Sequence, residues 1–233
     1  MKAKSDLLSA SNRQKTSVAP KNGGRRVTVR MPAAQRRAQV LAKAYDFFAE
    51  YGLTAQTRAL ADACGISQRL LYSIFPNKAA LINAVYETEI AGVFKAIWFA
   101  QLADRTKPIE QRLNAFYREY YDTVLTRRWL RLFLYASLAE VEMAPTYIAE
   151  IITRLLDTIV EETAKEAGLR IPENPAELRE IGWILHGAVS HLAIRREVYG
   201  GPSQLPVEVV LQLTVTSFLV GLRAILPLIA EAD

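Results

Sequence analysis

The stretch CGISQRLLYSIFPNK, residues 64–78, sets hydrogen-bonding side chains beside an apolar stripe. The stripe recurs at helical spacing and consists of Leu70, Leu71, Ile74 and Phe75. Once it is buried, five polar side chains stay outside: Ser67, Gln68, Arg69, Tyr72 and Ser73. Arginine pairs bidentately with guanine and glutamine with adenine, and polar side chains also suit phosphate oxygens. These residue types at this spacing therefore suit contact with nucleic acid.

Two short helices must position these side chains. The pattern predicts helices over residues 56–64 and 67–75, with Gly65 as the carboxyl cap of the first and Pro76 ending the second. A longer helix precedes them, from Pro32 until Gly52 stops it. Helices joined in this way form a helix-turn-helix, whose second helix lies in the major groove. The core we expect for it is Phe47, Phe48, Leu60, Ile66, Leu71 and Phe75.

Residues 37–85 resemble the DNA-binding domain of the tetracycline-repressor (TetR) family. RAQVLAKAYDFFAEYG is similar to the first helix of that domain, and TRALADACGIS is similar to its second helix and turn. RLLYSIFPNKAALINAVY is similar to its recognition helix and to the start of helix four. The family spacing is also kept by the pair Leu71-Tyr72 and by Phe75, Lys78 and Leu81.

The resemblance implies a role on DNA for each matching position. Thr57 would hold a phosphate and Arg58 would reach a groove. The residues implied to face bases are Gln68, Arg69 and Ser73, and those implied to grip phosphates are Tyr72 and Lys78. Two positions depart from the family pattern, because Leu70 stands where Ser or Thr is usual and Ile74 where His or Tyr is usual. Readout there would use apolar contact, for example with a thymine methyl group.

Charge divides the chain into a basic front and an acidic rear. Residues 1–86 hold 14 Lys and Arg against four acids, whereas residues 87–233 hold 15 against 20, so the halves carry +10 and −5. Residues 1–31, rich in Ser, Lys, Arg, Asn and Gly, read as a flexible basic arm. The arm would either lie along a duplex, with Arg25, Arg26 and Arg30 nearest to it, or only add solubility.

The remaining sequence predicts long helices. They cover about 77–103, 108–126, 128–141, 145–167, 175–199 and 206–229. The fold class is therefore all-α with about nine helices. We expect the arm at 1–31, the helix-turn-helix domain at 32–77 and a second helical domain at 78–233.

Composition argues for a cytoplasmic protein with no membrane segment. The first 26 residues lack an apolar signal core, and charged or polar residues interrupt every apolar run before the roughly 18 residues that a membrane span needs. The single cysteine, Cys64, allows no disulfide framework within the chain. His186 and His191 are five residues apart on one helix, so their rings diverge and do not share a metal ion. We expect no metal and no cofactor.

The rear domain offers a ligand pocket and a dimer interface. Its middle helices are rich in aromatic rings, and our ligand-binding candidates are Trp98, Phe116, Tyr117, Tyr120, Tyr121, Phe133, Trp183 and His186. Such rings suit a mostly apolar or aromatic small molecule, although plain core packing would give the same pattern. The last two helices are apolar on more than one face, which favours a homodimer formed through them.

The sequence contains no P-loop, HExxH, paired cysteines or nucleophile-elbow pattern, so we predict that the protein is not an enzyme. The resemblance implies a dimeric transcriptional regulator, most simply a repressor, that binds a near-palindromic site on double-stranded DNA and is released by a small-molecule effector. One alternative is a ligand-independent DNA binder whose rear domain contacts a protein. Another is an all-α binding module or enzyme with a basic tail.

Overall fold

The computed structural model describes residues 31–139, 142–200 and 205–230, and within these ranges it contains helices and no strand. The first half holds α1 (Ala33–Tyr51), α2 (Thr57–Ala63), α3 (Gln68–Ile74), α4 (Lys78–Val85), η1 (Tyr86–Ala91), α5 (Ile97–Leu102) and α6 (Ile109–Thr123). The second half holds α7 (Arg127–Leu138), α8 (Met143–Tyr147), η2 (Ile148–Ile152), α9 (Thr153–Ala167), α10 (Pro175–Ala193), η3 (Ile194–Val198) and α11 (Val207–Ala230). The segments labelled η are π-helical and directly extend their neighbours.

The all-α class is confirmed, with ten continuous helices among the described residues when each π-helical segment is counted with the helix it extends. The predicted basic arm, including Arg25, Arg26 and Arg30, lies outside the described residues apart from Met31. The domain boundary expected after residue 77 stays a prediction.

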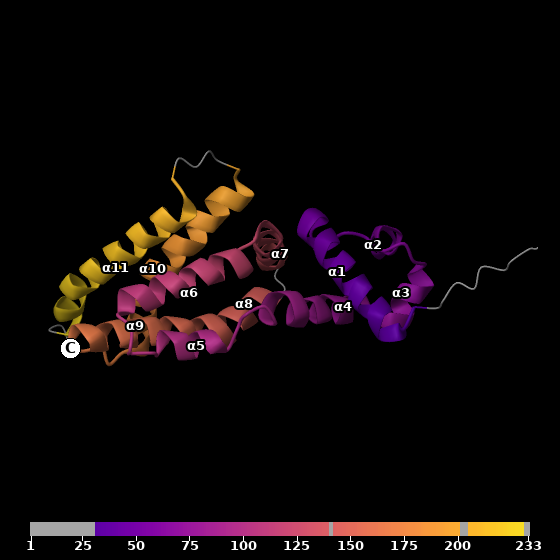
Figure 1. The fold of residues 1–233 in the computed structure, drawn as a ribbon. Helices are drawn as coiled ribbons and strands as arrows, with labels where there is room; N and C mark the ends of the chain where they lie inside the picture. Colours follow the sequence, from indigo (N-terminus) through magenta and orange to yellow (C-terminus); the bar gives the residue numbers. More distant parts are fainter. Residues whose placement is uncertain (1–30, 140–141, 201–204, 231–233) are drawn as a thin grey trace, which may run out of the picture. The chain divides into compact units, whose positions relative to one another are not determined.

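Helices α2 and α3 share a buried core with α1. Phe47 and Phe48 are buried on its inner face, together with Leu60 of α2 and Leu71 of α3. Gly52 ends α1 in the left-handed region, with φ of 79°. A side chain there would be strained, and the ring of Tyr135 from α7 occupies the adjoining space. Figure 1 shows these three helices side by side.

The long helix predicted over residues 77–103 is broken, and that prediction is wrong. Helix α4 continues through η1 only to Ala91, and a turn at residues 92–96 precedes α5. The wider π turn brings the carbonyl oxygen of Glu87 against Gly92, where a Cβ atom would lie 2.5 Å from it. Only glycine fits without a shift. Beyond the turn, Glu119 of α6 accepts hydrogen bonds from Lys95 and Trp98 and fixes the new course of the chain.

The helices from α5 to α11, which we call the rear helices, pack on one another. Helix α6 contacts α5, α9 and α11, and α10 lies against both α9 and α11 (Figure 1). The close approach of α10 to α9 depends on Gly182, because a Cβ atom there would lie 2.7 Å from Cβ of Leu156. Among the described residues, 207–227 of α11 are long and apolar enough to cross a membrane, but core helices of water-soluble proteins pass the same test.

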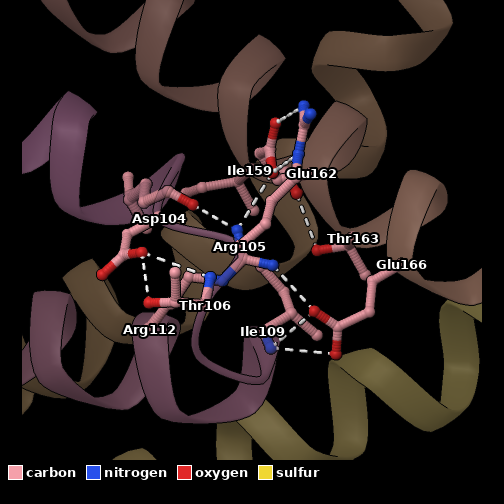
Figure 2. A network of polar contacts seen from close by, with 10 residues as sticks. Asp104, Arg105, Thr106, Ile109, Arg112, Ile159, Glu162, Thr163 and Glu166 are labelled. Atoms are coloured by element: carbon pink, nitrogen blue, oxygen red, sulfur yellow. Dashed lines mark hydrogen bonds and ion pairs between the residues drawn. The ribbon is translucent and has the colours of Figure 1, made fainter.

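A buried ionic network ties the start of α6 to α9, as Figure 2 shows. The side chain of Arg112 is 1% exposed and donates to Glu162 at 3.0 Å and to Glu166 at 2.7 Å. Arg105 donates two further hydrogen bonds to Glu162, which together with Arg112 hold the pKa of that carboxyl below its ordinary value. The backbone N–H of Ile109 donates to Glu166, so this carboxylate also caps α6.

We expect Glu162→Gln to lower the free energy of unfolding at pH 7 by about 3 kcal/mol, because it leaves Arg112 with less compensating charge. The depressed pKa in the folded state means that the carboxylate contributes stability above its unfolded pKa and loses that contribution as the pH falls below about 4. The gap between wild type and variant should therefore narrow in acid. Urea unfolding at several pH values measures it. The exposed neighbour supplies the control, Glu161→Gln, and an equal effect of both variants would contradict the assignment.

Candidate nucleic-acid interface

Helix α3 is held by its apolar side and leaves a polar side exposed. Leu71 and Phe75 are buried in the core, and Gly65 makes the preceding turn with φ of 67°. Gln68, Arg69, Tyr72 and Ser73 are all exposed. Four of the five polar side chains that the sequence predicted to stay outside the core thus lie on an exposed surface of α3. Together they offer hydrogen-bond donors and acceptors.

Ser67 caps the amino terminus of α3. It is the N-cap residue, and its hydroxyl oxygen accepts a hydrogen bond of 3.2 Å from the backbone N–H of Leu70. Ser73 donates from its own hydroxyl to the carbonyl of Leu70 at 2.7 Å. Both hydroxyl groups are thus engaged with the helix that carries them, and contact of either with DNA stays a prediction.

Two candidate phosphate-binding residues are joined to each other. The hydroxyl of Tyr72 donates to Oγ1 of Thr57 at 3.1 Å, which links α3 to the first residue of α2. Arg58 follows Thr57 and is exposed. The pair holds the amino terminus of α2 and the middle of α3 at a fixed spacing, which places both hydroxyl groups on one surface.

Lys78, at the start of α4, is oriented by the loop between α1 and α2. Its Nζ donates to the carbonyl of Ala55 at 2.7 Å, and partial burial lowers the pKa of the amine. Asn77 caps α4 by accepting from the backbone N–H of Ala80 at 2.8 Å. The motif resemblance indicated Lys78 but not its anchor, because a backbone carbonyl leaves no residue-specific signal in the sequence.

The two positions that depart from the family pattern behave differently. Ile74 packs against the core, as an apolar stripe predicts. Leu70 is partly buried but is not among the residues packed against that core. Arg37 of α1 lies over the ring of Phe75 at 5.0 Å, a contact that sequence reasoning missed.

Comparison with known proteins gives the same reading of this region. Residues 40–85 match the family model described as bacterial regulatory proteins, tetR family. This part of the chain is therefore similar to the DNA-binding domain of the TetR family of transcriptional regulators. A curated relative, the HTH-type transcriptional activator FasR of Mycolicibacterium smegmatis, is 30% identical over 103 residues. That match covers 44% of this chain and 46% of the relative, so it spans less than half of the relative's length.

Solved structures extend the likeness in fold to the helices that follow residue 85. A TetR-like transcriptional regulator from Rhodococcus sp. RHA1 has a TM-score of 0.63 and 21% identity, covering 82% of this chain and 100% of the other. SmeT, the repressor of the Stenotrophomonas maltophilia multidrug efflux pump SmeDEF, has a TM-score of 0.57 and 16% identity, covering 79% and 89%. The family and these neighbours are transcriptional regulators and not enzymes.

Most of the predicted ligand-binding side chains come together in one aromatic cluster of the rear helices. Trp98, Phe116 and Tyr120 contact one another at ring distances of 5.4–5.8 Å, and Tyr120 lies 5.5 Å from His186. Tyr117 and Trp183 also contact His186, and Phe133 joins through Tyr147. Tyr121 instead lies near Arg196 and Glu197 of η3, whose charges act on its hydroxyl.

Two further rings belong to this cluster: Phe94, which is one of the aromatic pocket candidates in the sequence, and Tyr147, which the sequence did not indicate. Phe94 contacts Trp98 at 5.0 Å and Tyr120 at 6.3 Å, and it is only partly buried. Tyr147 is buried, and its hydroxyl lies 3.5 Å from that of Tyr120. Neither residue belongs to a strong aromatic repeat, although Phe94 stands four residues before Trp98 at helical spacing.

Several hollows in the described part of the chain lie outside the aromatic cluster, and two of them have mostly apolar linings. One, of about 360 Å³, is a groove between α10 and α11 lined by residues such as Ile184, Leu213 and Phe218. Another, of about 740 Å³, borders α7, α8 and η2. In the part of the chain that the structure describes, no group of three or more His, Cys, Asp or Glu side chains is arranged to hold a metal ion.

We expect Ser67→Ala to reduce the free energy of unfolding by about 1 kcal/mol, because the N-cap of α3 is lost. Ser67→Asp should preserve stability, since its carboxylate can accept the same hydrogen bond. Thermal unfolding followed by circular dichroism measures both. Unchanged stability in Ser67→Ala would show that the hydroxyl does not act as a cap.

Proposed function

We propose that this protein is a dimeric, ligand-responsive transcriptional repressor that reads a near-palindromic operator through α3. The observation that carries the proposal is the two-sided character of this helix, which fixes Leu71 and Phe75 in the core while Gln68 and Arg69 stay exposed. A recognition helix needs both properties, because a loosely held helix cannot place side chains against base edges.

The exposed residues divide into base readers and phosphate contacts. Gln68 and Arg69 have the donors for adenine and guanine edges in the major groove. The linked pair of Thr57 and Tyr72 would flank one side of the helix and Lys78 the other, each holding a phosphate. The phosphate contacts would position the protein on DNA, and the two base readers would give specificity. Because phosphate contacts release counterions, the affinity for DNA should fall as the salt concentration rises.

The homodimer would form through α10 and α11. Exposed fractions of 52% at Ile184, 56% at Leu213 and 67% at Val220 leave large aliphatic side chains in water. Ile184 and Leu213 line the groove between the two helices, so a second copy can bury this face by packing its own pair of helices there. Two copies would set two α3 helices at the spacing of one duplex turn, about 34 Å.

Effector binding would change that spacing. Helix α4 begins at Lys78 beside the DNA-facing residues and extends through η1 to Ala91, and η1 contacts α7 and α8. Because α4 also packs on α1, a tilt of α4 and η1 would move the helices that pack on α1. A coupling of about 1–3 kcal/mol would weaken operator binding by roughly fivefold to 150-fold. A repressor of this kind works in the cytoplasm, on promoters that its operator overlaps.

Arg69→Ala should weaken specific DNA binding by about 1–3 kcal/mol, or roughly fivefold to 150-fold, through loss of a base contact. The duplex is first obtained by selecting genomic fragments with the wild-type protein, and affinity is then measured by fluorescence anisotropy at fixed salt. Arg170→Ala removes the same charge from an exposed rear position and should bind normally. Equal affinities for Arg69→Ala and wild type would sink the assignment of α3.

Leu213→Glu should convert the dimer to a monomer, because a carboxylate would be buried in the aliphatic interface. Gln212→Glu changes the adjacent exposed position and should remain dimeric. Light scattering after gel filtration gives the mass of each variant. A monomeric wild type, or a dimer that survives Leu213→Glu, would rule out this interface.

A further inference from the structure

The aromatic cluster contains four polar groups that are poorly satisfied. Tyr117, Tyr120, Tyr147 and His186 are all buried, and we call them the tyrosine–histidine cluster. The Tyr117 hydroxyl lies 3.5 Å from Nδ1 of His186, and the Tyr120 hydroxyl lies 3.5 Å from that of Tyr147. Both separations are at the outer limit of a hydrogen bond, so these groups have lost water and gained weak partners.

A fifth hydroxyl adjoins this cluster. The Oη atom of Tyr86 in η1 is buried and has no hydrogen-bond partner in the structure. It is close enough to Tyr147 for the two side chains to interact electrostatically. Buried polar atoms without good partners are uncommon in native proteins, and each asks for an explanation. A bound molecule that supplies the missing partners would be one.

The tyrosine–histidine cluster itself contains no charged group, and the carboxylates of Glu87 and Glu150 act on the adjoining hydroxyl of Tyr86. Burial alone lowers the pKa of His186 to about 4 and raises that of Tyr117, so both are neutral at physiological pH. The nearest cation on α5's side, Lys95, is paired with Glu119, and Arg154 is stacked over Phe99. An ionised group entering the cluster would lose its water without meeting an opposite charge.

One partly buried aromatic side chain, Phe94, borders the cluster at Tyr120 and also contacts Phe99. Phe94 lies on the turn between Gly92 and Ala96, is partly exposed, and places its ring against Trp98 and Tyr120. The turn is fastened by the ion pair of Lys95 and Glu119, whose side chains are 46% and 41% exposed. An ion pair this exposed contributes little to stability, so the turn can open at low cost.

We propose that the tyrosine–histidine cluster is the polar end of the effector site, and that it receives an uncharged aromatic or apolar molecule through a hydrogen-bonding group after the Phe94 ring is displaced. This deepens the proposed function, on which the identification of the molecule as an effector rests. The ring of the ligand takes the place of the Phe94 ring beside Trp98. Its polar group bridges the hydroxyls of Tyr120 and Tyr147. Two shorter hydrogen bonds to the ligand then replace the one long contact between these hydroxyls.

Four matched compounds test this assignment on the full-length protein: 4-phenylphenol, biphenyl, biphenyl-4-carboxylate and 4-(aminomethyl)biphenyl. Isothermal titration gives each dissociation constant, and fluorescence anisotropy follows release of the selected operator duplex. We expect 4-phenylphenol to bind roughly tenfold more tightly than biphenyl, as one added hydrogen bond provides. The two charged compounds should bind at least tenfold more weakly than biphenyl.

Three variants locate the binding. Tyr147→Phe should abolish the preference for 4-phenylphenol over biphenyl, whereas Tyr121→Phe, which removes a buried hydroxyl from the η3 side of α6, should keep it. Phe94→Ala should tighten the binding of both neutral compounds, because no ring has to be displaced. The ratio of two dissociation constants in one variant is unaffected by a general loss of stability.

The outcomes separate this inference from the proposed function. If the charged compounds bind as tightly as 4-phenylphenol, or if none of the four binds, the inference is overturned even when the operator is bound normally. Weaker binding to Phe94→Ala also overturns it. If the neutral preference and its loss in Tyr147→Phe are found but no duplex is bound, the site stands and the regulatory function fails.

Discussion

The placement of the DNA-facing helices depends on one arginine that closes the carboxyl end of α1. Arg131 of α7 donates from Nε to the carbonyl of Ala49 at 2.6 Å and from Nη2 to that of Glu50 at 2.9 Å. These carbonyls have no partners within the helix, so the guanidinium supplies them and meets the negative end of the helix dipole. Helices α2 and α3 pack on the buried rings of α1. The contact between α7 and α1 therefore helps to fix how α2 and α3 are oriented relative to α7.

Helix α7 is also joined to the aromatic cluster. The ring of Trp129 stacks on Phe133 at 4.7 Å and meets Tyr147 edge-on, while its indole N–H lies 3.5 Å from the carbonyl of Ile90 in η1. Ile90 is the second-last residue of η1, which extends α4. Both α4 and α7 connect the rear helices to α1. Because Trp129 of α7 contacts η1, which extends α4, we expect α4 and α7 to move together.

The sequence predicted those features that depend on neighbours along the chain. Gly52, Gly65 and Pro76 end helices by their own backbone preferences, and the helix-turn-helix resemblance indicated which side of α3 is exposed. The break at residues 92–96 was missed because it needs a π turn at Glu87 and a partner on α6, which no local pattern shows. Tyr121 was grouped with the cluster because helical spacing describes a broad aromatic surface and not which neighbour covers each part of it.

Helix α6 combines a fixed end with an adjustable one. At its start, Arg112 is held by charged partners in a buried network whose disruption is costly. Two turns later, the hydroxyl of Tyr120 has only a long contact with that of Tyr147. In the proposed mechanism, a molecule bound against Tyr120 would therefore displace the carboxyl half of α6 more easily than the amino half. Only three residues separate α6 from α7, so such a displacement would be passed to Arg131 and, through it, to the carboxyl end of α1.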